Sequence, residues 1–187
     1  MATKTLSKYL IRGRVPLGFL LAAICLIFAT PSSATVLAGA ALALTGLLWR
    51  AWASGHLRKN ERLATSGPYS YTRNPLYFGS FLLGSGFSLA CGRLPLVMLW
   101  VAFFLLVYWP VMRSEAAHIE QLFKADYPLY AQSVPLFWPR LRPWPAQHQT
   151  GFDWQLYLRY REYRALIGMV AVLAALVAKI YWLPTIN

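Results

Sequence analysis

Five stretches of the chain are almost free of charge and consist mainly of apolar residues. They cover residues 15–30, 34–53, 76–90, 94–112 and 165–183. Only Arg50 and Lys179 place a charge inside them. A helix needs about 20 apolar residues to cross a bilayer, and about 17 can suffice. The second, fourth and fifth stretches meet this length alone, whereas the first and third need a flanking turn. The pattern predicts an all-α membrane protein with about five transmembrane helices.

Composition supports this class of protein. Apolar residues make up 58% of the 187 residues and charged residues only 13%. The apolar fraction is higher, and the charged fraction lower, than in typical soluble domains. Five helices that are apolar on every side would leave a soluble globule of this length with too little polar surface. We therefore favour a membrane protein over a soluble one.

The distribution of positive charge predicts the orientation of these helices. Sixteen of the 18 lysines and arginines lie before the first stretch, around the second connection, or between the fourth and fifth stretches. Because basic residues gather on the cytoplasmic side, we expect a cytoplasmic N-terminus, an outside C-terminus and long cytoplasmic loops at 54–75 and 113–164. The formal net charge of +12 is spread over these flanks. It therefore indicates topology and contact with anionic lipid headgroups rather than nucleic acid.

The N-terminal segment allows a second interpretation. A basic start, an apolar run at 17–28 and small residues at 32–34 are also typical of a cleavable signal peptide. Its removal would leave four helices. Because further apolar stretches follow at once, we favour a retained first helix. Cys25 and Cys91 have no CxxC spacing, and we interpret them as packing residues.

The second long loop has structural signals of its own. Residues 113–123 are typical of a helix with Glu115 and His118 on one face, and they continue the fourth apolar stretch without a break. That helix is predicted to project beyond the membrane with Glu115 at its inner boundary. For the proline-broken aromatic segment 127–139 we predict no regular helix. Residues 153–164 alternate apolar and basic residues, which is typical of an interfacial segment.

Two motifs point to a family. Residues 67–81 read GPYSYTRNPLYFGSF and resemble the GPYxxxRHPxYxG signature of the isoprenylcysteine carboxyl methyltransferase and phospholipid methyltransferase family. Residues 113–139 read RSEAAHIEQLFKADYPLYAQSVPLFWP. They resemble the second block of that family, in which a Glu-Glu pair precedes spaced tyrosines and a VPRxxP element. The motifs have the order of the family and are separated by one apolar hairpin. The resemblance covers residues 66–139.

This resemblance implies a function and a domain organisation. It implies one membrane methyltransferase domain over residues 1–187, with a motif core at 66–139 and an interfacial segment and last helix at 151–187. The cofactor would be S-adenosyl-L-methionine, bound in a pocket at the cytoplasmic face of the cell membrane. The acceptor would be a membrane lipid or lipidated small molecule that carries either a prenylcysteine-type carboxylate or a lipid amine. A carboxylate needs no general base, whereas an amine would need Glu115 or His118 to remove a proton.

The motif positions supply the candidate site. We expect catalytic roles for Arg73, Asn74 and Glu115, with Arg73 and Glu115 binding the polar ends of the cofactor. The residues expected to bind the cofactor are Arg73, Asn74, Pro75, Tyr77, Gly79, Glu115, Tyr127, Tyr130 and Pro135. S-adenosyl-L-methionine is a zwitterionic sulfonium nucleoside. Its site requires a cationic side chain for the carboxylate, an anionic side chain for the ammonium group, and aromatic faces for the base and the sulfonium. No metal site is expected, because Glu115 and His118 lack a partner Glu-x-x-His.

Four positions depart from the family pattern. Asn74 replaces a His, Ala116 the second Glu, Lys124 a Gly, and Leu136 an Arg. Asn74 cannot titrate near neutrality, which argues against a proton-transfer role at this position. Arg140 follows the final proline of the second motif and is a candidate substitute for the missing arginine.

These residues also have interpretations that involve no cofactor. Arg73 is typical of a membrane-boundary anchor, Tyr69 and Tyr71 of interfacial aromatic residues, and Gly79 of a helix-packing face. Two other functions therefore stay open. One is a nicotinamide-dependent membrane reductase of the related sterol reductase group. The other is a non-catalytic membrane protein that has kept the fold. The sequence predicts no oligomeric state.

Overall fold

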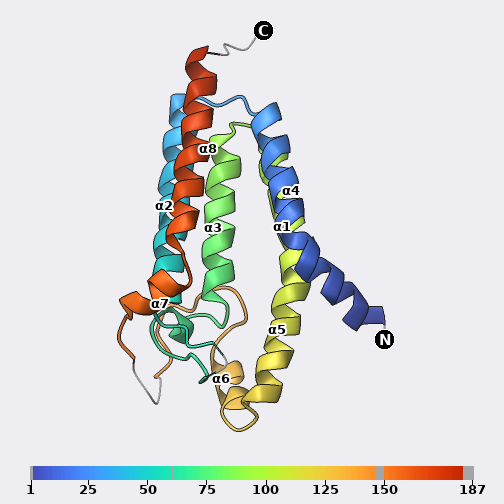
Figure 1. The fold of residues 1–187 in the computed structure, drawn as a ribbon, viewed down its shortest axis with the longest axis vertical. Coiled ribbons are helices and arrows are strands. Elements are labelled where there is room, and N and C mark those ends of the chain that lie inside the picture. The colour runs from blue at the N-terminus through green and yellow to red at the C-terminus, as the bar shows by residue number, and fades with distance from the viewer. Residues whose placement is uncertain (1, 60, 146–149, 183–187) are drawn as a thin grey trace.

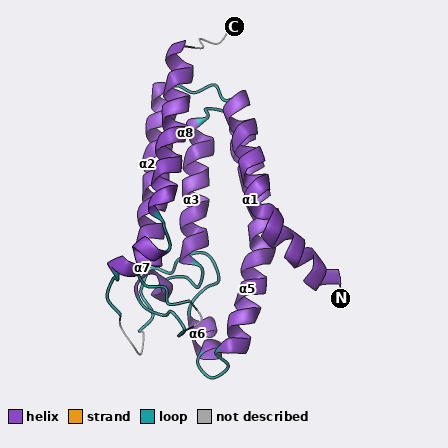
Figure 2. Ribbon diagram, in the orientation of Figure 1, coloured by secondary structure: helices purple, strands orange, loops and turns teal. Residues whose placement is uncertain are grey.

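The structure is a computed structural model, which describes residues 2–59, 61–145 and 150–182. Over these residues the chain is helical and contains no strand (Figure 2). The long helices are α1 (Ala2–Phe28), α2 (Ser33–Ser54), α3 (Pro75–Ala90), α4 (Leu94–Phe103), α5 (Trp109–Leu122) and α8 (Tyr163–Trp182). The short elements are η1 (Gly67–Ser70), the π-helical turn η2 (Phe104–Tyr108), α6 (Tyr127–Ser133) and α7 (Trp154–Arg159). The predicted all-α class is confirmed for the described residues.

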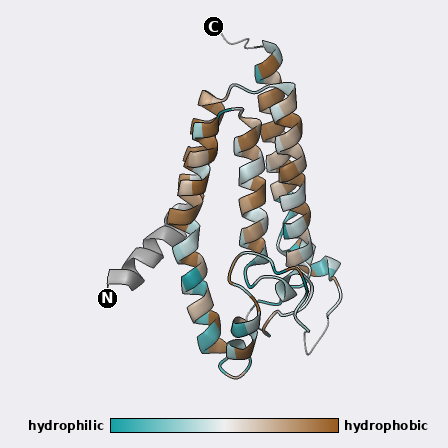
Figure 3. Cartoon of the chain, turned by 180° about the vertical axis from the view of Figure 1, so that it is seen from behind, coloured by the Kyte–Doolittle hydropathy of each residue, from teal (hydrophilic) through white to brown (hydrophobic). Residues whose placement is uncertain are grey.

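The long helices run side by side (Figure 1). In one group α2 contacts α3 and α8, and in the other α1 packs along the helix formed by α4, η2 and α5. α5 extends below α2, α3 and α8, and α6 lies beside its lower end, whereas α7 and the longer connections lie at the lower ends of α2, α3 and α8 (Figure 1). Hydrophobic residues dominate the upper helices, and hydrophilic residues are concentrated around α5 and the lower connections (Figure 3). The bundle therefore has an apolar upper part and a polar lower end.

Three described helices are long and apolar enough to cross a membrane: Ser33–Ser54, Leu94–Leu122 and Tyr163–Trp182. Large apolar side chains also stay exposed, and Leu37 and Leu106 are 74% and 73% accessible. Because water does not favour so much exposed apolar surface, the chain is a membrane protein. Val15–Phe28 is a shorter apolar helix and α3 has only 16 residues. Five spans and a cytoplasmic polar end therefore stay predictions.

Small residues bring α2 and α3 into close contact. A Cβ atom added to Gly46 would lie 2.6 Å from the Gly79 carbonyl oxygen, and one added to Gly79 would lie 2.8 Å from the Gly46 carbonyl oxygen. Gly39 and Gly86 make the same kind of contact two turns further along. Small residues let helix backbones approach closely in a membrane, where apolar burial gives little driving force. Gly79 therefore faces α2.

Hydrogen bonds join the helices at the upper end of the bundle. The backbone N–H of Thr30 donates to the carbonyl oxygen of Cys91 at 2.9 Å, which links the two short connections. The Nζ of Lys179 in α8 donates to the carbonyl oxygens of Leu26 and Ile27, at 2.9 and 2.8 Å. The last carbonyls of a helix have no partner within the helix. The last described helix thus caps the end of the first.

The structure confirms one prediction for the second long loop and corrects another. α4, η2 and α5 form one continuous helix of 29 residues, so the predicted helical continuation of the fourth apolar stretch is confirmed. Its projection beyond the membrane stays a prediction. The prediction of no regular helix over 127–139 is wrong for its first half, because α6 spans Tyr127–Ser133. Pro128 lies in the first turn of α6, where a missing N–H breaks no helical hydrogen bond. Residues 134–139 are irregular, as predicted.

Candidate cofactor site

The two motifs are joined by hydrogen bonds at the lower end of the bundle. The backbone N–H of Arg73 donates to the carbonyl oxygen of Pro135 at 2.9 Å. The side-chain amide of Asn74 donates to the carbonyl oxygen of Leu136 at 2.9 Å, across 62 residues of sequence. These bonds hold the irregular segment 134–139 against the turn that precedes α3. Pro75 is then the first residue of α3, where its fixed φ favours helix initiation.

A cavity of about 660 Å³ lies between these motifs. Small-molecule sites usually have volumes of about 300–1,000 Å³. Its walls come from the end of α2, residues 57–59 and 62–64 of the following connection, the start of α3, the η2–α5 helix and α6. Seven of the nine predicted cofactor residues line it, namely Arg73, Asn74, Pro75, Tyr77, Glu115, Tyr127 and Tyr130.

Arg73 presents a positive charge to this cavity. Its Nη1 donates to the hydroxyl of Tyr127 at 3.0 Å, and its guanidinium lies 5.8 Å from the centroid of the same ring. Its Nε is buried without a hydrogen-bond partner, and no ion pair with it occurs among the described residues. An unsatisfied buried donor costs about 1–3 kcal/mol. Arg73 therefore brings to the cavity wall a positive charge that has no carboxylate partner among the described residues.

Glu115 brings a carboxylate to the lining of the same cavity. Its Oε1 accepts a hydrogen bond of 2.8 Å from the hydroxyl of Tyr77 in the first turn of α3. The ring of Tyr108, from η2, contacts Tyr77 edge-on with centroids 5.8 Å apart. Glu115 is the one carboxylate among the described residues that line the cavity. Arg73 and Glu115, predicted to bind the two polar ends of one ligand, therefore share one cavity.

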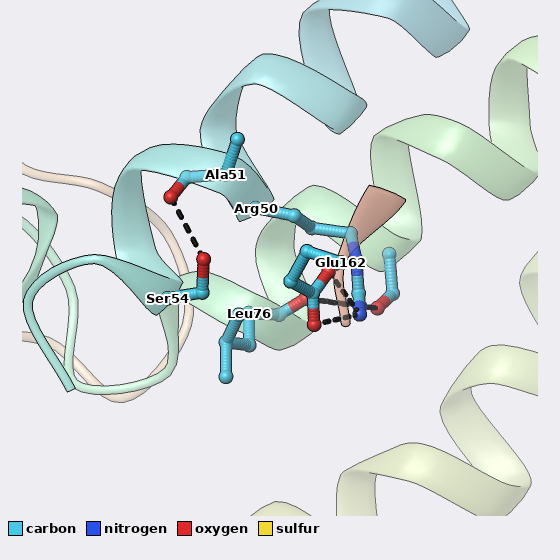
Figure 4. A network of polar contacts seen from close by, with 6 residues as sticks. Arg50, Ala51, Ser54, Leu76 and Glu162 are labelled. Atoms are coloured by element: carbon cyan, nitrogen blue, oxygen red, sulfur yellow. Dashed lines mark hydrogen bonds and ion pairs between the residues drawn. The ribbon is translucent and has the colours of Figure 1, made fainter. Parts of the chain in front are cut away.

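The remaining walls carry an excess of positive charge. Besides Arg73, the basic lining residues are Arg50, Arg58, Lys59 and Arg62. Arg50 forms two hydrogen bonds to the carboxylate of Glu162, at 3.0 and 2.9 Å (Figure 4). Arg58 pairs with Asp153 at 3.2 Å. These two pairs involve only two of the five basic lining residues, so basic side chains outnumber carboxylates in the described lining of the cavity.

Sequence reasoning missed the role of Arg50, which we interpreted only as a charge that sets topology. Its Nη1 also donates to the carbonyl oxygen of Leu76, at 3.3 Å, and to the hydroxyl of Ser80. One guanidinium thus joins α2, α3 and the turn before α8 (Figure 4). The available signal was an arginine inside an apolar stretch, because ionisable residues in such segments usually have a specific partner.

Two predicted cofactor residues do not line the cavity. Gly79 faces Gly46 in α2, and Pro135 contributes a backbone carbonyl to the bond with Arg73. Both shape the site from outside its open space. The helix-packing interpretation describes the surroundings of Gly79 better than cofactor contact does.

The tyrosines of the site differ in their contacts. The hydroxyl of Tyr130 donates to the backbone carbonyl of Tyr69 at 2.7 Å. Burial raises the pKa of both phenols above the ordinary value, so they stay neutral and Tyr130 can act as this donor. Tyr71 instead packs against Trp49 and Trp52, at centroid distances of 6.5 and 6.0 Å.

The positions that depart from the family pattern fall into two groups. Asn74 and Ala116 line the cavity, whereas Lys124 and Leu136 do not. The candidate substitute Arg140 donates through Nη1 to the carbonyl of residue 133 at 2.9 Å and lies outside the cavity lining. It therefore supports the 134–139 segment and adds no positive charge to the cavity wall.

Comparison with known proteins places this fold and site in a class. The chain is a helical membrane protein whose cavity is lined by residues of the two sequence motifs. The profile of the phospholipid methyltransferase family matches residues 34–126, a region that contains both Arg73 and Glu115. This match covers 93 of the 187 residues, and over it the chain is similar to the phospholipid methyltransferase family.

Two curated relatives match the same chain. The cobalt-zinc-cadmium resistance protein CzcN of Cupriavidus metallidurans is 38% identical over 104 residues. The nickel-cobalt-cadmium resistance protein NccN of Alcaligenes xylosoxydans xylosoxydans is 36% identical over 104 residues. Each alignment covers 55% of this chain and 47% of the relative, so the chain spans about half the length of these relatives. No solved structure gives a significant match.

Proposed function

We propose that the chain is an S-adenosyl-L-methionine-dependent methyltransferase that acts on a lipophilic, membrane-embedded acceptor. The observation that supports this proposal is the position of Arg73 and Glu115 in the walls of one cavity. The two residues come from the two motifs of the family, and their charges match the carboxylate and the ammonium group of the cofactor. The cavity would face the cytoplasm, as the distribution of basic residues predicts.

The residues present fit this cofactor. Arg73 would bind its carboxylate, Glu115 its ammonium group, and the rings of Tyr77 and Tyr127 would contact its remaining atoms. When bound, S-adenosyl-L-methionine supplies a methyl group activated by a sulfonium centre. Methyl transfer depends on alignment of two bound partners and on exclusion of water. The hydrogen bonds of Asn74 and Arg73 to the 134–139 segment hold the cavity wall in place for both purposes.

The charge of the cavity supports an acidic acceptor group. Lys59 and Arg62 line it and have no ion-pair partner among the described residues. An acceptor with a carboxylate, such as a prenylcysteine-type group, would be attracted to this basic wall. A lipid amine would carry a second positive charge into the cavity, and it would need Glu115 or His118 to remove its proton before methyl transfer.

Binding of S-adenosyl-L-homocysteine tests the cofactor proposal. We expect the purified full chain to give a saturable isotherm by titration calorimetry. Arg73→Ala should weaken binding about 10- to 100-fold, because a hydrogen bond to a charged group contributes about 1.5–3 kcal/mol. Arg159→Ala is the matched control, since Arg159 is exposed and lies outside the cavity lining. A wild-type chain without saturable binding would refute the proposal.

The acceptor is identified by a separate assay. Radiolabelled S-adenosyl-L-methionine would be incubated with the chain in vesicles that contain either a prenylcysteine analogue or phosphatidylethanolamine. We expect label in the prenylcysteine fraction. Label in phosphatidylethanolamine alone would contradict the proposal of an acidic acceptor but would still support methyltransferase activity.

Two alternatives are tested by the same preparation. Saturable binding of NADPH without binding of S-adenosyl-L-homocysteine would favour the membrane reductase, and binding of neither would favour a non-catalytic protein. The relatives are named for metal resistance. In the described part of the chain, no three His, Cys, Asp or Glu residues lie close enough to hold a metal ion.

A further inference from the structure

A π-helical turn places an aromatic residue in the wall of the cavity. Within the long α4–α5 helix, the N–H of Trp109 donates to the carbonyl of Phe104, five residues earlier. Pro110 follows directly, and its ring would clash with a carbonyl four residues earlier in a regular α-helix. The wider π turn relieves that clash, and such turns are frequent at functional sites. The turn ends on Tyr108, which lines the cavity.

The ring of Tyr108 is held in a fixed position. It stacks on the fully buried ring of Phe104, with centroids 5.0 Å apart and ring planes 16° apart. Glu115 follows seven residues later, so it lies two turns further along the same helix face. Tyr77 completes the group from α3, because it contacts both the Tyr108 ring and the Glu115 carboxylate. Two phenol rings and one carboxylate therefore meet at one wall.

This wall contains the one carboxylate among the described lining residues, Glu115, whereas the other charged lining side chains are lysine and arginine. The faces of aromatic rings carry negative potential. A sulfonium ion has a positive charge and no hydrogen-bond donor. Side chains therefore recognise it through a nearby carboxylate and through aromatic faces rather than through hydrogen bonds.

We propose that Tyr108, with Tyr77, binds the sulfonium centre of the cofactor and makes the site distinguish a charged sulfonium from a neutral thioether. This inference rests on the proposed function. The inference goes beyond that function because it assigns Tyr108, a residue outside both motif signatures, to the recognition of the reacting sulfur. The consequence is a site that prefers the substrate form of the cofactor to the product form, which favours release after methyl transfer.

The test compares two ligands that differ in this charge. Titration calorimetry on the purified full chain would measure the affinities of S-adenosyl-L-methionine and S-adenosyl-L-homocysteine. Tyr108→Leu should reduce the preference for the sulfonium about tenfold and change the affinity for the thioether little. Tyr108→Phe should keep the preference. Trp109→Leu is the control, since Trp109 adjoins Tyr108 and lies outside the cavity lining.

A second variant covers the case in which Tyr108→Leu does not fold. Incorporation of 3,4,5-trifluorophenylalanine at position 108 keeps the ring volume and removes most of the negative potential of its face. It should lower the affinity for S-adenosyl-L-methionine selectively. An equal loss for both ligands, or an unchanged preference, would overturn the role of Tyr108 and leave the methyltransferase intact. Failure of the wild type to bind either ligand would reject both proposals.

Discussion

The ion pair of Arg50 and Glu162 is expected to stabilise the wall of the site. Their side chains are 21% and 11% exposed. Arg50→Met keeps most of the apolar length of the side chain but leaves the Glu162 carboxylate without its partner. Breaking a buried pair costs about 3–5 kcal/mol, and an exposed pair contributes about 0–1 kcal/mol. The intermediate exposure of this pair places the cost of Arg50→Met at about 2–3 kcal/mol.

Thermal unfolding measures this loss. In a chain of this size each kcal/mol shifts the Tm by about 2–4 °C, so Arg50→Met should lower the Tm by about 4–12 °C. Cys25 and Cys91 are free and buried, so the reaction of a fluorogenic maleimide with them reports unfolding in detergent. Glu162→Gln supplies the second single variant of a double-mutant cycle. The double variant should lose less than the sum of the two single losses, because both remove the same interaction.

The control for this experiment is the more exposed pair of Arg58 and Asp153. These side chains are 41% and 30% exposed, and exposed pairs contribute about 1 kcal/mol or less. Arg58→Met should therefore change the Tm by no more than about 4 °C. A Tm for Arg50→Met within about 1 °C of the wild type, or strictly additive losses in the cycle, would refute the reasoning.

Three further predictions use the same unfolding assay. Gly46→Ala should destabilise the chain by about 1–3 kcal/mol because the added Cβ overlaps the backbone of α3, whereas Gly168→Ala, with open space around it, should be neutral or slightly stabilising. Asn74→Ala should lower stability by about 1 kcal/mol through loss of its bond to Leu136 and should weaken S-adenosyl-L-homocysteine binding. Burial raises the pKa of the Tyr130 phenol in the folded chain. The neutral phenol therefore contributes fully to the stability of the fold below the pKa of the unfolded chain, which is about 10, and this contribution is lost as the pH rises further. Tyr130→Phe should therefore flatten the decline in stability above about pH 10.

Each of these predictions has an outcome that contradicts it. Equal Tm values for Gly46→Ala and Gly168→Ala would exclude a close contact of α2 with α3. An Asn74→Ala chain with wild-type stability would show that the 134–139 segment is held by other bonds. The same alkaline decline with and without Tyr130→Phe would remove that phenol as its cause.

Much of the fold could be predicted from local signals. Apolar stretches gave helices at all five predicted positions within the described residues, because a helix satisfies its own backbone groups in lipid. The joint position of Arg73 and Glu115 also followed from sequence, since each lies in a long motif. The wrong prediction for residues 127–139 also arose from a local sequence signal. Pro128 was taken as a helix breaker, but a proline in the first turn leaves a helix intact.

The remainder of the site depended on contacts that no local pattern specifies. Arg50 and Glu162 are 112 residues apart, and Glu162 lies in a loop whose preceding residue has a positive φ of 55°. Tyr108 reaches the cavity through a π turn, and the sequence signal for it, Pro110, is equally compatible with a simple kink. Contacts of this kind depend on how the helices pack against one another, so the local sequence does not predict them.

The bond between Lys179 and the end of α1 has a consequence for the order of assembly. Lys179 is made 153 residues after Leu26, so a growing chain inserts its first helix long before the group that caps it exists. Glu162 likewise arrives long after Arg50. The long helices that precede α8 are therefore made with these two polar positions open, and both positions are closed only when Glu162 and Lys179 have been synthesised.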